Sequence, residues 1–157
     1  MVGCGGPSFI VPPDLDEKLD RKATFSKLSE SPDAYRGHIV MLTGMVLNLK
    51  ILPKFTRVEL LQLPLDSDGL PVTDLNASQG RFIANCHGVI DPQRIPSGTR
   101  MTVIGEMLGT SQIKGSNYNY ITVVTKAIHV HPHEGVKMLK DPKVLWSICP
   151  TAPHGIP

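Results

Sequence analysis

Residues 38–66 read HIVMLTGMVLNLKILPKFTRVELLQLPLD, and this stretch decides the fold class. Its first arm, residues 38–52, contains no proline and is rich in Ile, Val, Leu and Met; the second arm, residues 55–63, returns after Pro53-Lys54. At ~3.3 Å per residue the first arm would reach about 50 Å if straight, longer than a usual strand. We therefore expect it to bend at Gly44, because glycine lets a strand coil or bulge. A long coiled strand that turns back on itself predicts a small barrel.

Three later segments complete the predicted set of five strands. Residues 81–86 alternate strictly between an apolar and a mixed face, which is the period of a half-buried strand. Residues 99–108 and 118–130 are the fourth and fifth strands, joined by a hairpin loop at residues 109–117. An irregular segment with Asp91-Pro92 and Ser97-Gly98 links the third strand to the fourth. Five strands, a coiled first strand and an irregular link between the third and fourth predict an all-β, OB-like barrel of five to six strands. A β-sandwich is the alternative.

The two ends of the chain differ from this body. Residues 1–14 are rich in Gly and Pro and predict an extended tether, and residues 133–157 predict a Pro-rich irregular tail. Between them, residues 15–132 form the predicted barrel domain. Leu15, Leu19 and Ala23 follow i, i+4 spacing, and Phe25 and Leu28 form a second pair. We expect one or two short helices here, ending before Ser31-Pro32 and covering an open end or edge of the sheet.

The composition excludes few functions, but it argues against strong binding of nucleic acid. The chain of 157 residues has a net charge of +2, and its charges form no run of one sign. Strong electrostatic attraction to nucleic acid is therefore not indicated. No apolar run reaches the roughly 18 residues of a membrane-spanning helix.

Val2-Gly3-Cys4 matches the end of a bacterial lipoprotein signal, in which small residues precede the cysteine that becomes the mature N-terminus. The charged and apolar parts of such a signal do not stand before it. Either residues upstream of Met1 are missing from this sequence, or the match arises by chance.

Further pieces of the sequence follow Cys4 in a fixed order over residues 4–130. They are Cys4 with a Pro-rich tether; Tyr35-Arg36-Gly37 before a strand containing Leu42-Thr43-Gly44; Glu59 leading to Leu63-Pro64-Leu65-Asp66; Gly69-Leu70-Pro71; Gly80-Arg81-Phe82; Ile90-Asp91-Pro92; Val103-Ile104-Gly105; and Tyr118-Asn119-Tyr120. In this order they resemble the Slp-type (starvation-inducible) outer-membrane lipoproteins, small lipid-anchored envelope proteins. The chain departs from the family pattern at Ile95, where an aromatic residue is frequent, and beyond Trp146.

The resemblance implies a lipidated Cys4 on a non-enzymatic protein without a cofactor. It implies anchoring in the outer membrane of a Gram-negative bacterium, on the periplasmic face, with a structural or envelope-stress role. Gly5 rather than Asp follows Cys4, which by analogy with lipoprotein sorting favours the outer membrane. The implied partners are the membrane, through the lipid, and an envelope protein or polymer that the sequence does not identify.

His129 and His131 are the candidate metal ligands. Alternation along a strand sets them on the same side, close enough to share Zn²⁺ or Cu²⁺. Pro132 ends the strand before His133, and only Glu134 stands nearby as a further ligand. We therefore favour a solvated strand end over a metal site.

Cys86 and Cys149 leave two alternatives open. They could form a disulfide in an oxidising periplasm. Alternation also places Cys86 on the apolar face, where a free buried cysteine is common, and this second interpretation is preferred.

Glu59, Asp66 and Asp91 are the candidate acids. Asp66 and Asp91 stand beside prolines where strands pass into loops, which favours turn capping over catalysis. No Ser/His/Asp or Cys/His arrangement has a workable spacing, so we predict no enzyme.

A soluble OB-type module that binds oligonucleotide or oligosaccharide is the alternative function. Stacking of bases needs exposed aromatic rings and a basic groove. The candidates on the predicted strands are the aromatic residues Phe82, Tyr118 and Tyr120 and the cations Arg57, Arg81, Arg100 and Lys126. Because Phe82 belongs to the predicted core, we expect no nucleic-acid partner.

Overall fold

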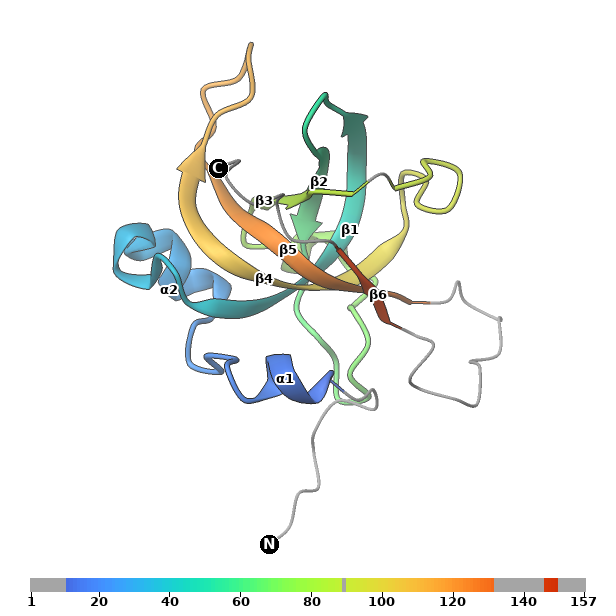
Figure 1. The fold of residues 1–157 in the computed structure, drawn as a ribbon. Coiled ribbons are helices and arrows are strands. Elements are labelled where there is room, and N and C mark those ends of the chain that lie inside the picture. The colour runs from blue at the N-terminus through green and yellow to red at the C-terminus, as the bar shows by residue number, and fades with distance from the viewer. Residues whose placement is uncertain (1–10, 89, 132–145, 150–157) are drawn as a thin grey trace, which may run out of the picture.

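The computed structural model describes residues 11–88, 90–131 and 146–149, and within them the chain forms a ring of strands with two short α-helices (Figure 1). The elements are α1 Pro13–Asp16, α2 Phe25–Glu30, β1 Ile39–Ile51, β2 Thr56–Gln62, β3 Arg81–Cys86, β4 Arg100–Ser111, β5 Tyr120–Val130 and β6 Trp146–Ile148. Single 3₁₀ turns stand at Pro32–Tyr35 and Leu75–Ala77.

The strands close into a five-stranded barrel with one extra strand. Their order in the sheet is β3-β2-β1-β4-β5-β6, and β3 also pairs with β5, which closes the ring. The β3–β5 pair is parallel and every other pair is antiparallel. This topology confirms the predicted OB-like β-barrel.

The long first strand serves both halves of the barrel. Its first half, from Ile39 to Met45, pairs with β4, and its second half, from Gly44 to Ile51, pairs with β2. A Cβ atom on Gly44 would collide with the carbonyl oxygen of Leu61 and press on the ring of Phe82. Glycine is therefore required where β1 changes partner, as the sequence predicted, although the register shift itself falls between Val46 and Asn48.

Replacement of Gly44 by alanine is expected to lower the free energy of unfolding by about 1–3 kcal/mol, the usual penalty for forcing an extra methyl into a packed site. The neighbouring carbonyl cannot move away without opening the β1–β2 ladder. Urea denaturation followed by circular dichroism measures the change. Thr110→Ala, at an exposed position of β4, is the control and should shift stability by less than ~0.5 kcal/mol. An unchanged midpoint for Gly44→Ala would contradict this account of β1.

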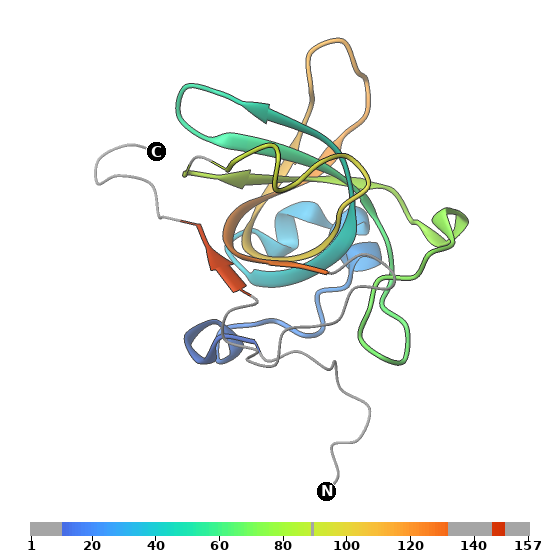
Figure 2. The same cartoon turned by 90° about the vertical axis from the view of Figure 1, so that its right-hand side faces the viewer.

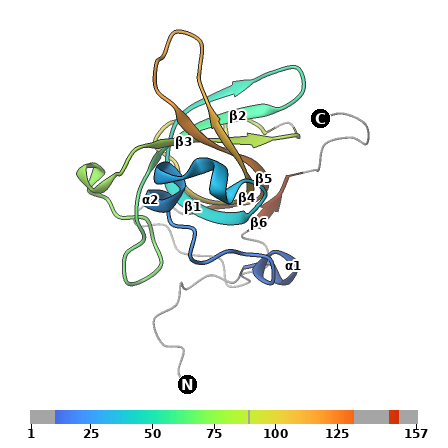
Figure 3. The ribbon, with the colours of Figure 1, turned by 90° about the vertical axis from the view of Figure 1, so that its left-hand side faces the viewer.

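Helix α2 closes one end of the barrel. Figure 3 shows α2 lying across the ring of strands, and Figure 2 shows it behind the ring from the other side. Thr24 caps the helix by accepting a hydrogen bond from the backbone N–H of Lys27. The buried side chains of Phe25 and Leu28 join the barrel core, where the rings of Phe25 and Phe82 lie 6.3 Å apart. The predicted covering role of this helix is thus confirmed.

The structure corrects the predicted helical face of Leu15, Leu19 and Ala23. Helix α1 ends at Asp16, and Leu19 instead forms an isolated bridge with Ile39. Leu15 packs outside the barrel with Ile104 and Ala127, whereas Ala23 joins the interior core. The segment runs between these two sites, so one continuous helix could not serve both.

The sequence predicted an irregular tail over residues 133–157, whereas Trp146–Ile148 within this range form strand β6. Strands β3 and β6 pair with the same edge of β5, one after the other. Phe82–Asn85 of β3 pair with the first half of β5, and β6 pairs with Ala127–His129 near its end. A strand this short leaves no detectable alternation in the sequence. None of the helices in the described residues has the length and apolarity needed to cross a membrane.

Candidate functional site

The outer surface of the barrel carries a group of polar and aromatic side chains that we call the tyrosine cluster: Tyr118, Tyr120, Glu59 and Arg81. Tyr120 is the first residue of β5 and Tyr118 lies two residues before it. Glu59 is on β2, and Arg81 is the first residue of β3. The strand register places Glu59 beside Ile83 on the neighbouring strand, and Ile83 beside Thr122 on β5. The cluster therefore spans three strands over a floor that includes the buried Ile83.

Hydrogen bonds hold the cluster in one arrangement. The hydroxyl of Tyr120 donates to Oε2 of Glu59 at 2.8 Å, and Nη1 of Arg81 lies 3.5 Å from the same oxygen. The backbone N–H of Arg81 donates to the hydroxyl oxygen of Tyr118 at 3.0 Å. The two tyrosine rings meet edge to face with centroids 4.8 Å apart, a preferred geometry for aromatic pairs. Each ring is thereby fixed at its hydroxyl and by its neighbour.

Gly80 allows this close approach. Its φ is +146°, in a region that favours glycine, and a Cβ atom there would lie 2.5 Å from the hydroxyl of Tyr118. Any other residue would push Tyr118 off the backbone of β3.

Exposure separates the two rings. Tyr120 is 3% exposed, whereas Tyr118 is 41% exposed. The side chain of Glu59 is 13% exposed and that of Arg81 is 50% exposed. Beside them, Ser111 and Thr122 share a hydrogen bond of 2.6 Å, and the amide of Gln112 donates to Asn119 at 2.9 Å. The surface thus offers one exposed aromatic ring among hydrogen-bonding groups of balanced charge.

The sequence named the members of this cluster without predicting their contact. Glu59 and Tyr120 are 61 positions apart. Alternation assigns Glu59 to an outward face, but only the parallel β3–β5 pairing places β5 along the edge of β3 opposite β2, so that Glu59 and Tyr120 meet across β3.

The residues considered for nucleic-acid stacking are dispersed. Phe82 is buried in the core, and Tyr120 is covered, which leaves Tyr118 as the exposed ring. Arg57 and Arg81 lie on the neighbouring strands β2 and β3, whereas Arg100 lies on β4 beside Met45 and Lys126 lies on β5 beside Cys149. The four cations therefore do not line a single groove.

His129 and His131 do come together, as alternation predicted. Their ring centroids are 4.4 Å apart, edge to face, and the ring of Trp146 lies 5.6 Å from that of His129. Nε2 of His131 is hydrogen-bonded to Oγ1 of Thr102 at 2.8 Å.

The predicted solvated strand end is wrong for this pair. His129 is 0% exposed and His131 is 4% exposed. The physical reason is the outer layer formed by β6, which pairs with β5 at Ala127–His129 and lays Trp146 against His129. Burial first, and the charge of His129 second, lower the pKa of His131 to about 4.

Within residues 11–88, 90–131 and 146–149, no group of three or more His, Cys, Asp or Glu side chains is placed to hold a metal ion. The other potential ligands that the sequence offered, His133 and Glu134, lie outside the described residues. The pair itself is an aromatic contact within a packed outer layer.

The remaining acids occupy turns. Oδ1 of Asp66 accepts the backbone N–H groups of Asp68 and Leu70, at 2.8 and 3.0 Å. Oδ1 of Asp91 accepts the N–H of Gln93 at 2.9 Å. Both therefore serve the turn role that the sequence favoured.

Cys86 and Cys149 form a disulfide, so the preferred interpretation of a free buried Cys86 is wrong. Their Cα atoms are 5.6 Å apart, within the normal range for such a bond. The disulfide joins the ends of β3 and β6, which lie along the same edge of β5. Alternation detected the apolar site of Cys86 but not the distant chain that returns to it. Cys4, the predicted lipidation site, lies outside the described residues.

Comparison with known proteins extends the similarity over nearly the whole chain. The model of the "Outer membrane lipoprotein Slp family" matches residues 1–153, well beyond the 4–130 over which the motifs stand. An uncharacterized protein of Haemophilus influenzae is 32% identical over 128 residues, which are 78% of this chain. The chain spans 66% of the length of that relative. No solved structure matches the chain. Because the family model matches nearly the whole chain, the protein belongs to the Slp family of outer membrane lipoproteins.

Proposed function

We propose that the protein is anchored through acylated Cys4 to the outer membrane of a Gram-negative bacterium, with its barrel on the periplasmic face. The barrel performs no chemistry and has a structural or envelope-stress role through contact with another envelope component. The observation that carries the proposal is the family match over residues 1–153, which includes Val2-Gly3-Cys4.

The physical basis for anchoring is the burial of acyl chains. Each buried CH₂ group contributes ~0.8 kcal/mol, so several chains on one cysteine make attachment effectively permanent. The Gly- and Pro-rich segment after Cys4 is then a spacer between the lipid and the barrel.

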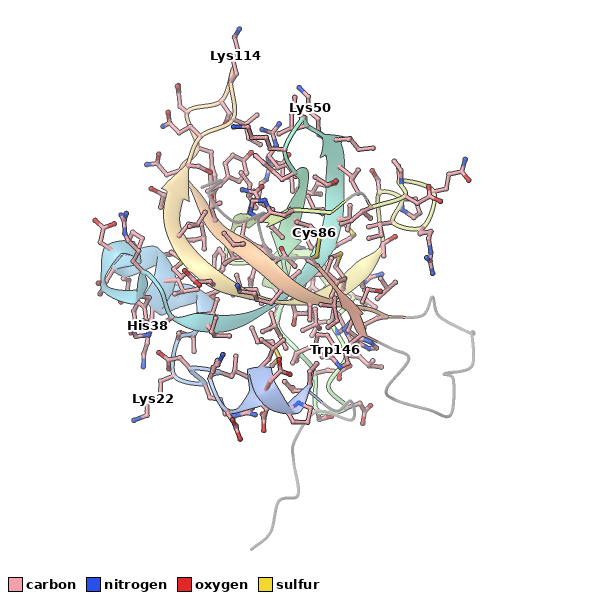
Figure 4. The ribbon with its side chains drawn as sticks, in the orientation of Figure 1. Lys22, His38, Lys50, Cys86, Lys114 and Trp146 are labelled. Carbon is pink, nitrogen blue, oxygen red and sulfur yellow. A yellow bond between two sulfur atoms is a disulfide. The ribbon has the colours of Figure 1, made fainter. Side chains whose placement is uncertain are left out.

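One feature of the described residues supports a periplasmic location, and a second supports the orientation of the barrel relative to the membrane. The Cys86–Cys149 disulfide is the kind of bond that persists in an oxidising compartment. The described chain begins near α1, at the opposite end of the molecule from the β1–β2 and β4–β5 loops, whose tips carry Lys50 and Lys114 (Figures 1 and 4). A tether leaving from the α1 end would direct these loops away from the membrane.

Acylation of Cys4 is expected to decide where the protein partitions. The gene, expressed with its native upstream sequence in a Gram-negative host given radioactive palmitate, should yield a labelled protein in the outer-membrane fraction. Cys4→Ser should be unlabelled and leave that fraction. Cys149→Ser is the matched control, because it also removes one cysteine but should retain the label. Equal labelling of the wild type and Cys4→Ser would refute the anchor.

A further inference from the structure

The tyrosine cluster is an ordered group of surface side chains that the lipid anchor does not explain. Its four side chains come from β2, β3, β5 and the segment just before β5, and they converge on the outside of the barrel. Glu59 Oε2 and the edge-to-face ring pair join all four. We propose that this surface binds an uncharged sugar chain of the cell envelope, with Tyr118 as the stacking ring and Glu59 and Arg81 as the polar contacts.

The rigidity of the surface is the first argument. Tyr118 is held at its hydroxyl by the backbone of Arg81 and at its edge by the buried Tyr120. Its ring is nevertheless 41% exposed. A ring fixed in place and still open to solvent loses little conformational freedom when a flat apolar partner stacks on it. The axial C–H faces of a sugar ring are such a partner.

The second argument is the set of hydrogen-bonding groups beside the ring. Glu59 uses Oε2 for both of its contacts, and among the described residues Oε1 accepts no hydrogen bond. The guanidinium of Arg81 is half exposed and offers several N–H donors. A carboxylate oxygen that accepts and a guanidinium that donates several hydrogen bonds lie side by side. Together they suit two neighbouring hydroxyl groups of a sugar, because each hydroxyl both donates and accepts.

The charge of the tyrosine cluster favours a neutral sugar chain over a nucleic acid as the ligand that stacks on Tyr118. Glu59 and Arg81 balance each other within 3.5 Å. A strand of nucleic acid requires an excess of cations along its path, which the four side chains of the tyrosine cluster do not supply. A neutral polymer meets no such requirement.

The position of the cluster in the fold is the third argument. It lies on the β2–β3–β5 face, which is flanked by the β1–β2 and β4–β5 loops (Figure 1). In OB-type barrels this face and these loops are where oligosaccharides and oligonucleotides bind. The sugar partner rests on the proposed periplasmic orientation, which turns this end toward the glycan layer of the envelope.

The test is binding of the purified, unacylated full chain to soluble β-1,4-linked oligomers of N-acetylglucosamine, followed by ¹⁵N–¹H NMR and calorimetry. We expect saturable binding with chemical-shift changes at Glu59, Arg81 and Tyr118, little dependent on salt. Tyr118→Ala should weaken it at least tenfold, and Glu59→Gln should also weaken it. Leu108→Ala is the control, because Leu108 on β4 is 42% exposed, nearly the same as Tyr118, but lies outside the cluster.

Three outcomes would overturn the proposal: no binding at millimolar oligomer, binding that Tyr118→Ala leaves unchanged, or saturable and salt-sensitive binding of single-stranded oligonucleotide at this face instead. Retained backbone dispersion in the NMR spectrum of each variant excludes unfolding as the cause of lost binding. Because the protein in this test carries no lipid, its result is independent of the palmitate experiment, and the two proposals can fail separately.

Discussion

Loss of the Cys86–Cys149 disulfide is expected to lower the free energy of unfolding by about 4 kcal/mol. The bond closes a loop with a sequence separation of 63 residues. In the chain-entropy model, releasing a loop of this length returns that much conformational freedom to the unfolded state. The native state loses a restraint as well, because the disulfide adds to the contacts that hold β6 to β5. Among these are three residue pairs, the ring contact of Trp146 with His129, and a hydrogen bond from the backbone N–H of Cys149 to the carbonyl oxygen of Lys126.

Guanidinium denaturation of the wild type with and without reductant measures this effect, and Cys149→Ser should reproduce the reduced protein. Cys4→Ser is the matched control and should leave the midpoint unchanged, since the other two cysteines are already paired. Trp146, the single tryptophan of the chain, reports on β6 directly. Its emission should shift to the red on reduction as it leaves the ring of His129. Identical denaturation curves with and without reductant would contradict a role of the bond in stability.

Acid is expected to destabilise the protein through His131. The pKa of His131 is lowered to about 4 in the folded state, first by burial and second by the charge of His129, against about 6.5 in an unfolded chain. Between these values the unfolded state binds more protons than the folded state, so the free energy of unfolding falls as the pH falls. Stability is therefore complete above pH 6.5 and declines toward pH 4, by at most about 3 kcal/mol.

The measurement is the free energy of unfolding at a series of pH values between 4 and 7. His131→Gln should flatten the decline, because an amide can still bond Thr102 but cannot take up a proton. His87→Gln, a substitution outside the histidine pair, should leave the decline caused by His131 in place. A profile for His131→Gln that is as steep as that of the wild type would show that other groups cause the acid sensitivity.

The barrel was predictable from the sequence because its signals are local. Residues 81–86 alternate cleanly, and β3 occupies this same range. The long arm before Pro53 became β1, with Gly44 at the place where it changes partner. The observed ends of the other strands differ from the predicted ends by at most three residues, as expected where turn and strand preferences compete.

The contacts of the candidate site were not predictable, because each joins segments that are distant in the chain. The sequence named Glu59, Arg81 and Tyr120 separately, and none of their spacings indicates that a phenol meets a carboxylate across two strands. The predictions of a solvated His129 and of a free Cys86 were wrong for the same reason. Both depend on β6, a strand too short to have a pattern of its own.

Local sequence patterns were sufficient to assign the apolar face of each strand, the position at which the long strand coils, and the family motifs along the chain, since these depend on neighbouring residues. Which outward faces are covered and which stay open follows from the packing of the folded chain. An outward side chain such as His129 is buried when another segment crosses it, and an outward Tyr118 stays exposed when none of the described segments does. That difference is set by packing between distant parts of the chain, which no local pattern records.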